Sequence, residues 1–592
     1  MASNGSPDRA GQEPVMHMNP RIEVDRAMIL DAQKRGRGAL FKTYLKLSGP
    51  GWLQSGITLG GGSLSSSLYL GVLVGFSFMW LQPLAMILGI IMLSAIAYVT
   101  LSTGQRPLRA INEHVSPVLG WGWLLASMVA NLVWSLPQFS LGTAAIRQNL
   151  LPGLLGGGAG SAIPDPAAKV VTVGLFLAMC ITVTTFYSIG GRGVKVFETI
   201  IRVFVSVIVL CFCGVVIKLS IAGQIEWGLI LRGLIPDFSL LMKPTDSIMP
   251  HIQEVGEQFR SFWSDMIVRD QRDVMISAAA TAVGINMTFL LPYSMLRKGW
   301  DKDFRGLAIF DLSTGLFIPF LLATGFVVIA SASQFHAQPA KGFLGEVDEA
   351  GQAIAPAPNL VSGYNGLLTQ RLKFEIGTEA FGELSEEQIK QRTEALPQAD
   401  KTMAAMLVQR DAFNLASTLE PLIGARWAQY IFGLGVIGMA MSAATMLMTI
   451  NGLCFCELLG LPPRGWPQRI GALIVSVGAL GPFFWNKAAF WLAVPTSVFA
   501  MTLLPIAYIA FYFLMNQRKV LGDSMPRGAH RVLWNVLMAL AVAGAGFGGI
   551  WSIWSKTQQR FGSGWYGMIL VFGFIALVVI VHVVRAGKRK PA

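Results

Sequence analysis

Uncharged apolar blocks of about 20 residues recur along this chain of 592 residues and limit its fold more than any other feature. Residues 78–98 form one such block and contain no charged side chain. An α-helix of about 20 residues spans the roughly 30 Å hydrocarbon core of a bilayer. Only 13% of all residues are charged, about half the fraction typical of soluble domains. The sequence therefore predicts an all-α integral membrane protein with many spans.

The apolar blocks, bounded by glycine, proline or charge, predict about twelve transmembrane helices. Their approximate limits are residues 47–72, 77–102, 120–146, 169–189, 194–220, 272–297, 305–332, 427–458, 468–486, 488–516, 532–555 and 564–585.

Basic residues gather in alternate loops between these blocks. Residues 30–46 carry five basic side chains and one acid, and residues 517–531 carry four and one. Cytoplasmic loops of membrane proteins collect lysine and arginine. Twelve spans with both termini in the cytoplasm place all the basic loops on the inner side. We therefore expect a multi-pass plasma-membrane protein that is surrounded by membrane lipids.

Two long polar connections divide the chain further. Residues 335–424 hold twelve acids and seven bases, a net charge of −5, and fall on the outer side in this topology. The expected divisions are a cytoplasmic tail (1–46), a first repeat of helices 1–5 (47–220), an external connection (221–271), helices 6–7 (272–334), an external insertion (335–424), helices 8–10 completing the second repeat (425–516), and helices 11–12 with a cytoplasmic tail (517–592).

Other function classes find no support in the sequence. The formal charge of +13 follows from the basic loops, and no zinc-finger, RNA-recognition or P-loop pattern accompanies it, so we expect no nucleic-acid partner. No nucleophile–base pair or cluster of metal ligands is present, so we expect neither an enzyme nor a bound cofactor. The Cys-x-Cys pairs at residues 211–213 and 454–456 lie in predicted helices, where residues two apart do not face each other.

Glycines interrupt the first predicted span. Residues 59–67 read Leu-Gly-Gly-Gly-Ser-Leu-Ser-Ser-Ser near its middle. Three successive glycines free the backbone, and unwound backbone at membrane depth is tolerated only where it lines a cavity or is buried in protein. We therefore expect a broken helix in which Gly60 exposes backbone and Ser63 supplies a side-chain oxygen. Packing through small residues is the alternative explanation.

The sixth predicted span has a similar interruption. Gly284 is followed by Asn286, Thr288 and Pro292. Spans one and six are matching members of a five-plus-five inverted repeat, and interrupted spans at matching positions indicate the binding site of a secondary transporter. We expect Gly284, Asn286 and Thr288 to line that site.

Two further polar residues lie in the third predicted span. Asn131 and Gln138 are seven residues apart and so share a helix face. They are weaker candidates for the same site, because hydrogen bonding between helices explains such residues equally well.

The order of these segments resembles the NRAMP (natural resistance-associated macrophage protein) family of proton-coupled divalent metal transporters. The likeness is carried by Gly-Pro-Gly at residues 49–51, by Tyr-Ser-Met-Leu at residues 293–296 and by the glycine- and methionine-rich run from Gly435 to Gly452. The resemblance implies the leucine-transporter-like fold with broken helices 1 and 6. It also implies a divalent cation as substrate and a proton as coupling ion.

The metal-ligand motifs of that family are not reproduced. Its first helix carries Asp-Pro-Gly-Asn, and residues 60–63 here are Gly-Gly-Gly-Ser. Its sixth helix carries Met-Pro-His-Asn, and residues 286–289 are Asn-Met-Thr-Phe. Ser63 and Asn286 remain as oxygen ligands for the transported ion. Without a carboxylate the site cannot neutralise a dehydrated divalent ion, but neutral oxygens suit a hard ion that keeps its waters.

We therefore predict a secondary transporter that moves Mg²⁺ or Mn²⁺ by alternating access. Exposed N–H groups of the glycine run could equally hold an anion, which leaves a small organic solute such as an amino acid as the alternative substrate. A membrane sensor that transports nothing is the alternative from a different class.

Overall fold

The computed structural model describes residues 21–156, 161–189, 192–348, 351–485 and 487–588. Over these residues the chain forms helices and one isolated β-bridge, between Val347 and Ala353. The predicted all-α membrane fold is thereby confirmed. The first 20 residues of the expected N-terminal tail lie outside the described residues.

Each predicted span coincides with one helix or with two or three consecutive helical segments. Nine segments in the described part of the chain are long and apolar enough to cross a membrane. They are α5 (Leu81–Thr103), α7 (Pro117–Ala144) with η1 (Ala145–Leu150), α9 (Asp165–Ile189), α13 (Arg260–Ala280) with α14 (Ile285–Arg297), α15 (Arg305–Asp311) with η5 (Leu312–Leu316) and α16 (Phe317–Phe335), α23 (Ala425–Leu458), η8 (Ala489–Leu492) with α26 (Ala493–Met515), α28 (Gly528–Phe561), and α29 (Trp565–Lys588). The other predicted spans are α3 (Pro50–Thr58) with α4 (Gly61–Val74), α10 (Arg192–Ile221), and α24 (Gly465–Ile474) with η7 (Val475–Leu480) and α25 (Gly481–Phe484).

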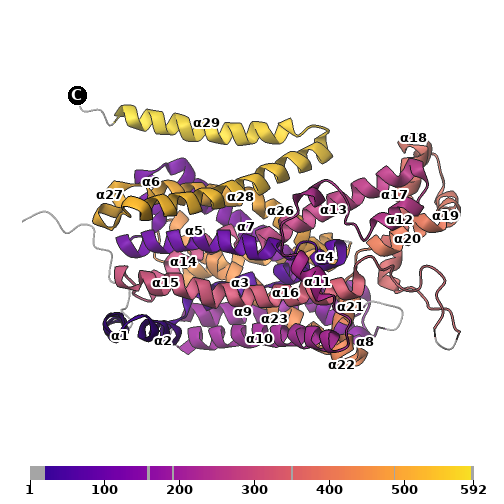
Figure 1. The fold of residues 1–592 in the computed structure, drawn as a ribbon, viewed down its shortest axis with the longest axis horizontal. Helices are drawn as coiled ribbons and strands as arrows, with labels where there is room; N and C mark the ends of the chain where they lie inside the picture. Colours follow the sequence, from indigo (N-terminus) through magenta and orange to yellow (C-terminus); the bar gives the residue numbers. More distant parts are fainter. Residues whose placement is uncertain (1–20, 157–160, 190–191, 349–350, 486, 589–592) are drawn as a thin grey trace, which may run out of the picture.

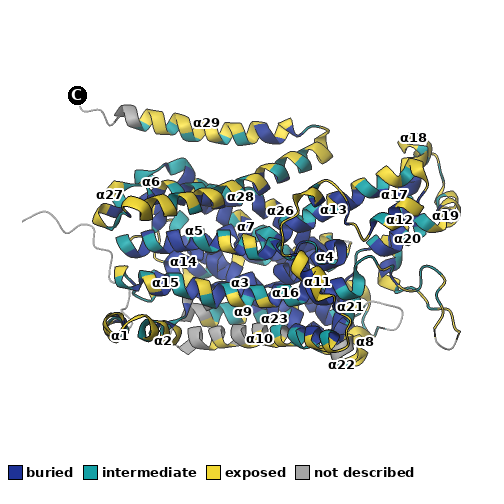
Figure 2. Ribbon diagram, viewed as in Figure 1, coloured by how far each residue is buried: buried dark blue, intermediate teal, exposed yellow. Residues whose placement is uncertain are grey.

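The broken first span lies at the centre of the bundle (Figure 1). Every residue of α4 is buried, and Figure 2 shows α4, α7 and α14 as largely buried while α29 is exposed along much of its length. The glycines and serines of α4 explain its position, since small side chains let neighbouring helices approach closely in a membrane.

The two ends of the bundle carry different additions (Figure 1). The helices α1 (Ile22–Arg35) and α2 (Arg37–Leu47) lie at one end, together with the end of α29. The insertion lies at the opposite end and contains α17 (Pro358–Ile376), α18 (Thr378–Gly382), α19 (Glu386–Glu394) and α20 (Gln398–Leu407).

The insertion has a small core of its own, which attaches it to α13. Trp263 of α13 is fully buried there and donates its indole N–H to Asp400 at 2.7 Å. Asp400 also pairs with the fully buried Arg371 at 3.0 Å. Because breaking a buried ion pair leaves an uncompensated charge, this triad fixes the insertion to the start of the broken sixth span.

Candidate functional site

The first span breaks at residues 59–60, as the glycine run predicts. Helix α3 ends at Thr58, and α4 begins at Gly61. Gly60 is extended (φ −79°, ψ 179°) and occupies the N-cap position of α4. A β-carbon on Gly60 would lie 2.6 Å from that of Ala443, so the close approach of α23 requires glycine here.

The sixth span breaks in the same way. Helix α13 ends at Ala280 and α14 begins at Ile285, with Gly284 extended (φ −83°, ψ 158°) at the N-cap. A β-carbon on Gly284 would lie 2.5 Å from the Trp134 ring and 2.6 Å from Asn286 Oδ1. The two breaks therefore share one construction, an extended glycine that starts the second half-helix in a crowded space.

Ser63 connects the two breaks. Its hydroxyl lies within hydrogen-bonding distance of the Thr58 carbonyl and 3.3 Å from the Thr281 carbonyl. Thr58 and Thr281 stand where α3 and α13 end, and the carbonyl end of a helix carries partial negative charge. The ends of both half-helices therefore meet at this serine.

A cavity of about 40 Å³ lies beside this junction. It is lined by Ile57, Gly62, Ser63, Trp134, Gln138, Ala280, Thr281, Gly284, Asn286, Met287, Ala443 and Leu447. A buried space of roughly 10–15 Å³ is enough for one water molecule, so the cavity has room for an ion with part of its hydration shell.

Two buried amides in the lining keep hydrogen-bonding capacity free. Neither side-chain atom of Asn286 has a hydrogen-bond partner, and neither does Oε1 of Gln138. Buried polar groups are normally paired, so these atoms are available to bind a polar ligand or water in the cavity. The only sulfur in the lining is engaged elsewhere, because Met287 Sδ accepts a hydrogen bond from Thr58 Oγ1 at 3.2 Å.

The structure gathers some of the predicted site residues and separates others. Ser63, Gly284, Asn286 and Gln138 line the cavity, whereas Gly60 forms the adjacent cap. The Thr288 hydroxyl accepts a hydrogen bond from Trp123 Nε1 at 2.8 Å and does not face the cavity.

Asn131 also lies outside the lining. It is fully buried, and its side-chain atoms have no partner. Sequence reasoning did not identify Trp134 or Thr281 as lining residues. Trp134 precedes Gln138 by four positions on α7, so the two side chains lie on the same helix face. This spacing could have identified Trp134 as a neighbour of Gln138 in the site.

The acidic side chains near the membrane spans have structural partners. Asp311 accepts hydrogen bonds from the Gly49 N–H at 3.1 Å, from the Gly51 N–H at 2.6 Å and from the Ser48 hydroxyl. It therefore caps the start of α3. Glu457 pairs with Arg106 at 2.8 Å. Among the described residues no three His, Cys, Asp or Glu side chains are grouped so that they could hold a metal.

Comparisons with known proteins give a family and a fold. The family model described as natural resistance-associated macrophage protein-like matches residues 51–363 and 399–554. A mutant of the Eremococcus coleocola manganese transporter superposes with a TM-score of 0.58 at 13% identity, over 91% of this chain and 94% of that one.

The complex of the same transporter with an aromatic bis-isothiourea substituted compound gives a TM-score of 0.57 at 13% identity, over 93% and 96% of the two chains. No curated protein matches this sequence. At this identity the structural likeness establishes the fold alone.

Proposed function

Because the chain belongs to the natural resistance-associated macrophage protein-like family, we propose that it carries a divalent metal ion across the membrane by alternating access. The ion is hard and largely hydrated, with Mg²⁺ and Mn²⁺ as the expected substrates. Ser63, Asn286 and Gln138 contact it through side-chain oxygens, and the backbone around Gly60 and Gly284 supplies carbonyls.

The observation that carries this proposal is the uncharged cavity between the two breaks, into which hydroxyl and amide side chains project from an otherwise largely apolar lining. Hydroxyl, amide and carbonyl oxygens favour hard cations over soft ones. No lining residue is a carboxylate, so the protein cannot replace the whole hydration shell of a divalent ion. Mg²⁺ gives up its waters reluctantly and is commonly bound with several of them in place.

The size of the cavity favours an ion over an organic solute. Its volume is about 40 Å³, well below the roughly 150 Å³ of an apolar cavity that holds benzene. An amino acid therefore does not fit this conformation, but an ion with a few waters does.

The proposal also covers the orientation of the protein in the membrane and the coupling of ion transport to a proton. Helix α2 carries three bases and no acid, and it lies with α1 at the end opposite the acidic insertion (Figure 1), which supports cytoplasmic termini in a plasma membrane. None of the lining side chains titrates near neutral pH. We infer that the ion crosses with its full charge and that a coupled proton takes another route.

Replacing Asn286 with alanine tests the site directly. We expect Mg²⁺ uptake into proteoliposomes to fall by about tenfold to a hundredfold, because one polar contact to a charged ligand contributes roughly 1.5–3 kcal/mol. The amide makes no hydrogen bond to the protein, so the variant should fold normally.

Asn365→Ala serves as the control, since this asparagine is exposed in the insertion and should leave uptake unchanged. Uptake of organic solutes alone, with no response to any divalent ion, would contradict the proposal. A complete absence of flux for every solute would instead favour a sensor.

A further inference from the structure

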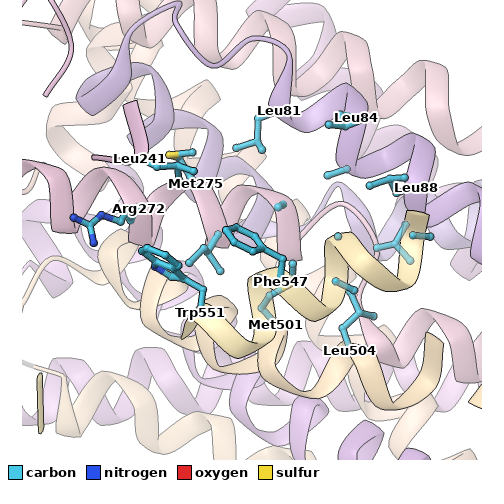
Figure 3. Close-up of a pocket in the computed structure, with 18 of the residues that line it drawn as sticks. Leu81, Leu84, Leu88, Leu241, Arg272, Met275, Met501, Leu504, Phe547 and Trp551 are labelled. Carbon is cyan, nitrogen blue, oxygen red and sulfur yellow. The ribbon is translucent and has the colours of Figure 1, made fainter. Parts of the chain in front are cut away.

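A second cavity opens between α5, α13, α26 and α28, away from the central site (Figure 3). It has a volume of about 210 Å³. Its lining is mostly apolar and includes Leu84, Leu88, Arg272, Leu504, Phe547 and Trp551. We call it the lateral groove, because exposed apolar residues such as Leu84 and Phe547 border it.

Arg272 is the only charged residue in the lining of the lateral groove. Its guanidinium lies 5.6 Å from the centre of the Trp551 ring, and its Nε atom is buried without a hydrogen-bond partner. Figure 3 shows both side chains at one end of the groove, with Leu88 and Leu504 towards the other. No ion pair of Arg272 is found within the described residues.

Two of the neighbouring acids are engaged by other bases, and the exposed Asp265 attracts Arg272 without forming an ion pair with it among the described residues. Asp273 pairs with Lys556, and Asp270 pairs with Arg269 at 3.2 Å. The guanidinium of Arg272 therefore presents positive charge to whatever occupies the groove.

The depth of Arg272 matches a membrane interface. Eight residues separate it from the end of α13 at Ala280, which is about 12 Å along a helix axis. The break that follows lies near the middle of the span, and half of the hydrocarbon core is about 15 Å. The guanidinium thus reaches the level of lipid headgroups, while the apolar part of the groove runs towards the bilayer centre.

We propose that the lateral groove binds one acyl chain of an anionic phospholipid, with the lipid phosphate at Arg272. The guanidinium is a strong partner for phosphate, and indole rings prefer the interfacial region in which Trp551 lies. The apolar lining excludes a hydrophilic solute, so the bilayer is the source of the ligand.

The lateral groove shares a wall with the central site. Ala279 and Val283 line the groove, while Ala280, Thr281 and Gly284 line the central cavity. A bound acyl chain therefore supports the broken segment of the sixth span from its lipid side. This binding stands apart from the proposed transport function and can be measured without it.

Native mass spectrometry of the full-length protein with added lipid tests the proposal. We expect phosphatidylglycerol to bind about fivefold more tightly than phosphatidylcholine, because one basic residue near a membrane surface contributes about 1 kcal/mol. Arg272→Gln should remove this preference. Arg426→Gln, which removes the same charge from an exposed position of α23 outside the groove, should retain it.

A variant that fills the lateral groove tests lipid binding without changing Arg272. Gly544→Leu places a side chain against Leu88 and should displace the bound lipid of either kind. Gly546→Leu on the same helix, where no atom lies within 4 Å of an added β-carbon, should leave binding intact. Equal binding of both lipids by the unmodified protein, or a preference that survives Arg272→Gln, would overturn the proposal.

Discussion

Replacing Gly284 with alanine is expected to lower Mg²⁺ uptake into proteoliposomes by at least about a hundredfold. The added β-carbon would lie 2.5 Å from the Trp134 ring and 2.6 Å from Asn286 Oδ1. Both side chains line the central cavity, so the crowding displaces a contact to the ion and reduces the space. A misplacement of about 1 Å at such a site can cost two orders of magnitude in rate.

Gly174→Ala is the matched control for this substitution. Gly174 lies on α9 with no atom within 4 Å of an added β-carbon, and alanine is the better helix former. Uptake by this variant should equal that of the unmodified protein. Normal uptake by Gly284→Ala would show that the substrate does not pass through the cavity between the breaks.

Replacing Asp311 with alanine is expected to lower the free energy of unfolding by about 3 kcal/mol, since each buried donor left without a partner costs about 1–3 kcal/mol. Asp311 accepts hydrogen bonds from the backbone N–H groups of Gly49 and Gly51, and its negative charge also lies at the favourable end of α3. A thermal-unfolding measurement in detergent should show a transition several degrees lower.

Two further variants distinguish the loss of the hydrogen-bond acceptor at the start of α3 from the loss of a negative charge. Asp311→Asn keeps an acceptor at the helix end and should lose about half as much stability as the alanine variant. Asp523→Ala removes an exposed carboxylate and should change stability by less than about 0.5 kcal/mol. A fully stable Asp311→Ala protein would mean that α3 does not depend on this cap.

The spans and their breaks could be predicted from the sequence, because lipid offers no hydrogen bonds and so restricts the backbone of an apolar block to few conformations. An uncharged block of about 20 residues has few alternatives to a helix, and glycine runs weaken a helix locally. Both arguments use only neighbouring residues. The extended glycines at positions 60 and 284 follow from them.

The partners of individual polar side chains could not be predicted in the same way, because they depend on contacts between distant segments. The Thr288 hydroxyl accepts a hydrogen bond from Trp123 on another helix. The position of Thr288, two residues after Asn286, had suggested that both residues line one site. Asp311 caps a half-helix about 260 residues earlier in the chain. Nothing local to either residue indicates these contacts.

Uptake of Mg²⁺ by proteoliposomes under an imposed membrane potential, with equal pH on both sides, tests the proposed transport most directly. An ion that crosses with both charges gains about 4.6 kcal/mol from 100 mV, twice the value for one elementary charge. We therefore predict that an inside-negative potential accelerates uptake by the unmodified protein, and that Gly284→Ala abolishes this response. Failure of both Mg²⁺ and Mn²⁺ to enter at any potential, while an amino acid is taken up, would contradict the proposal.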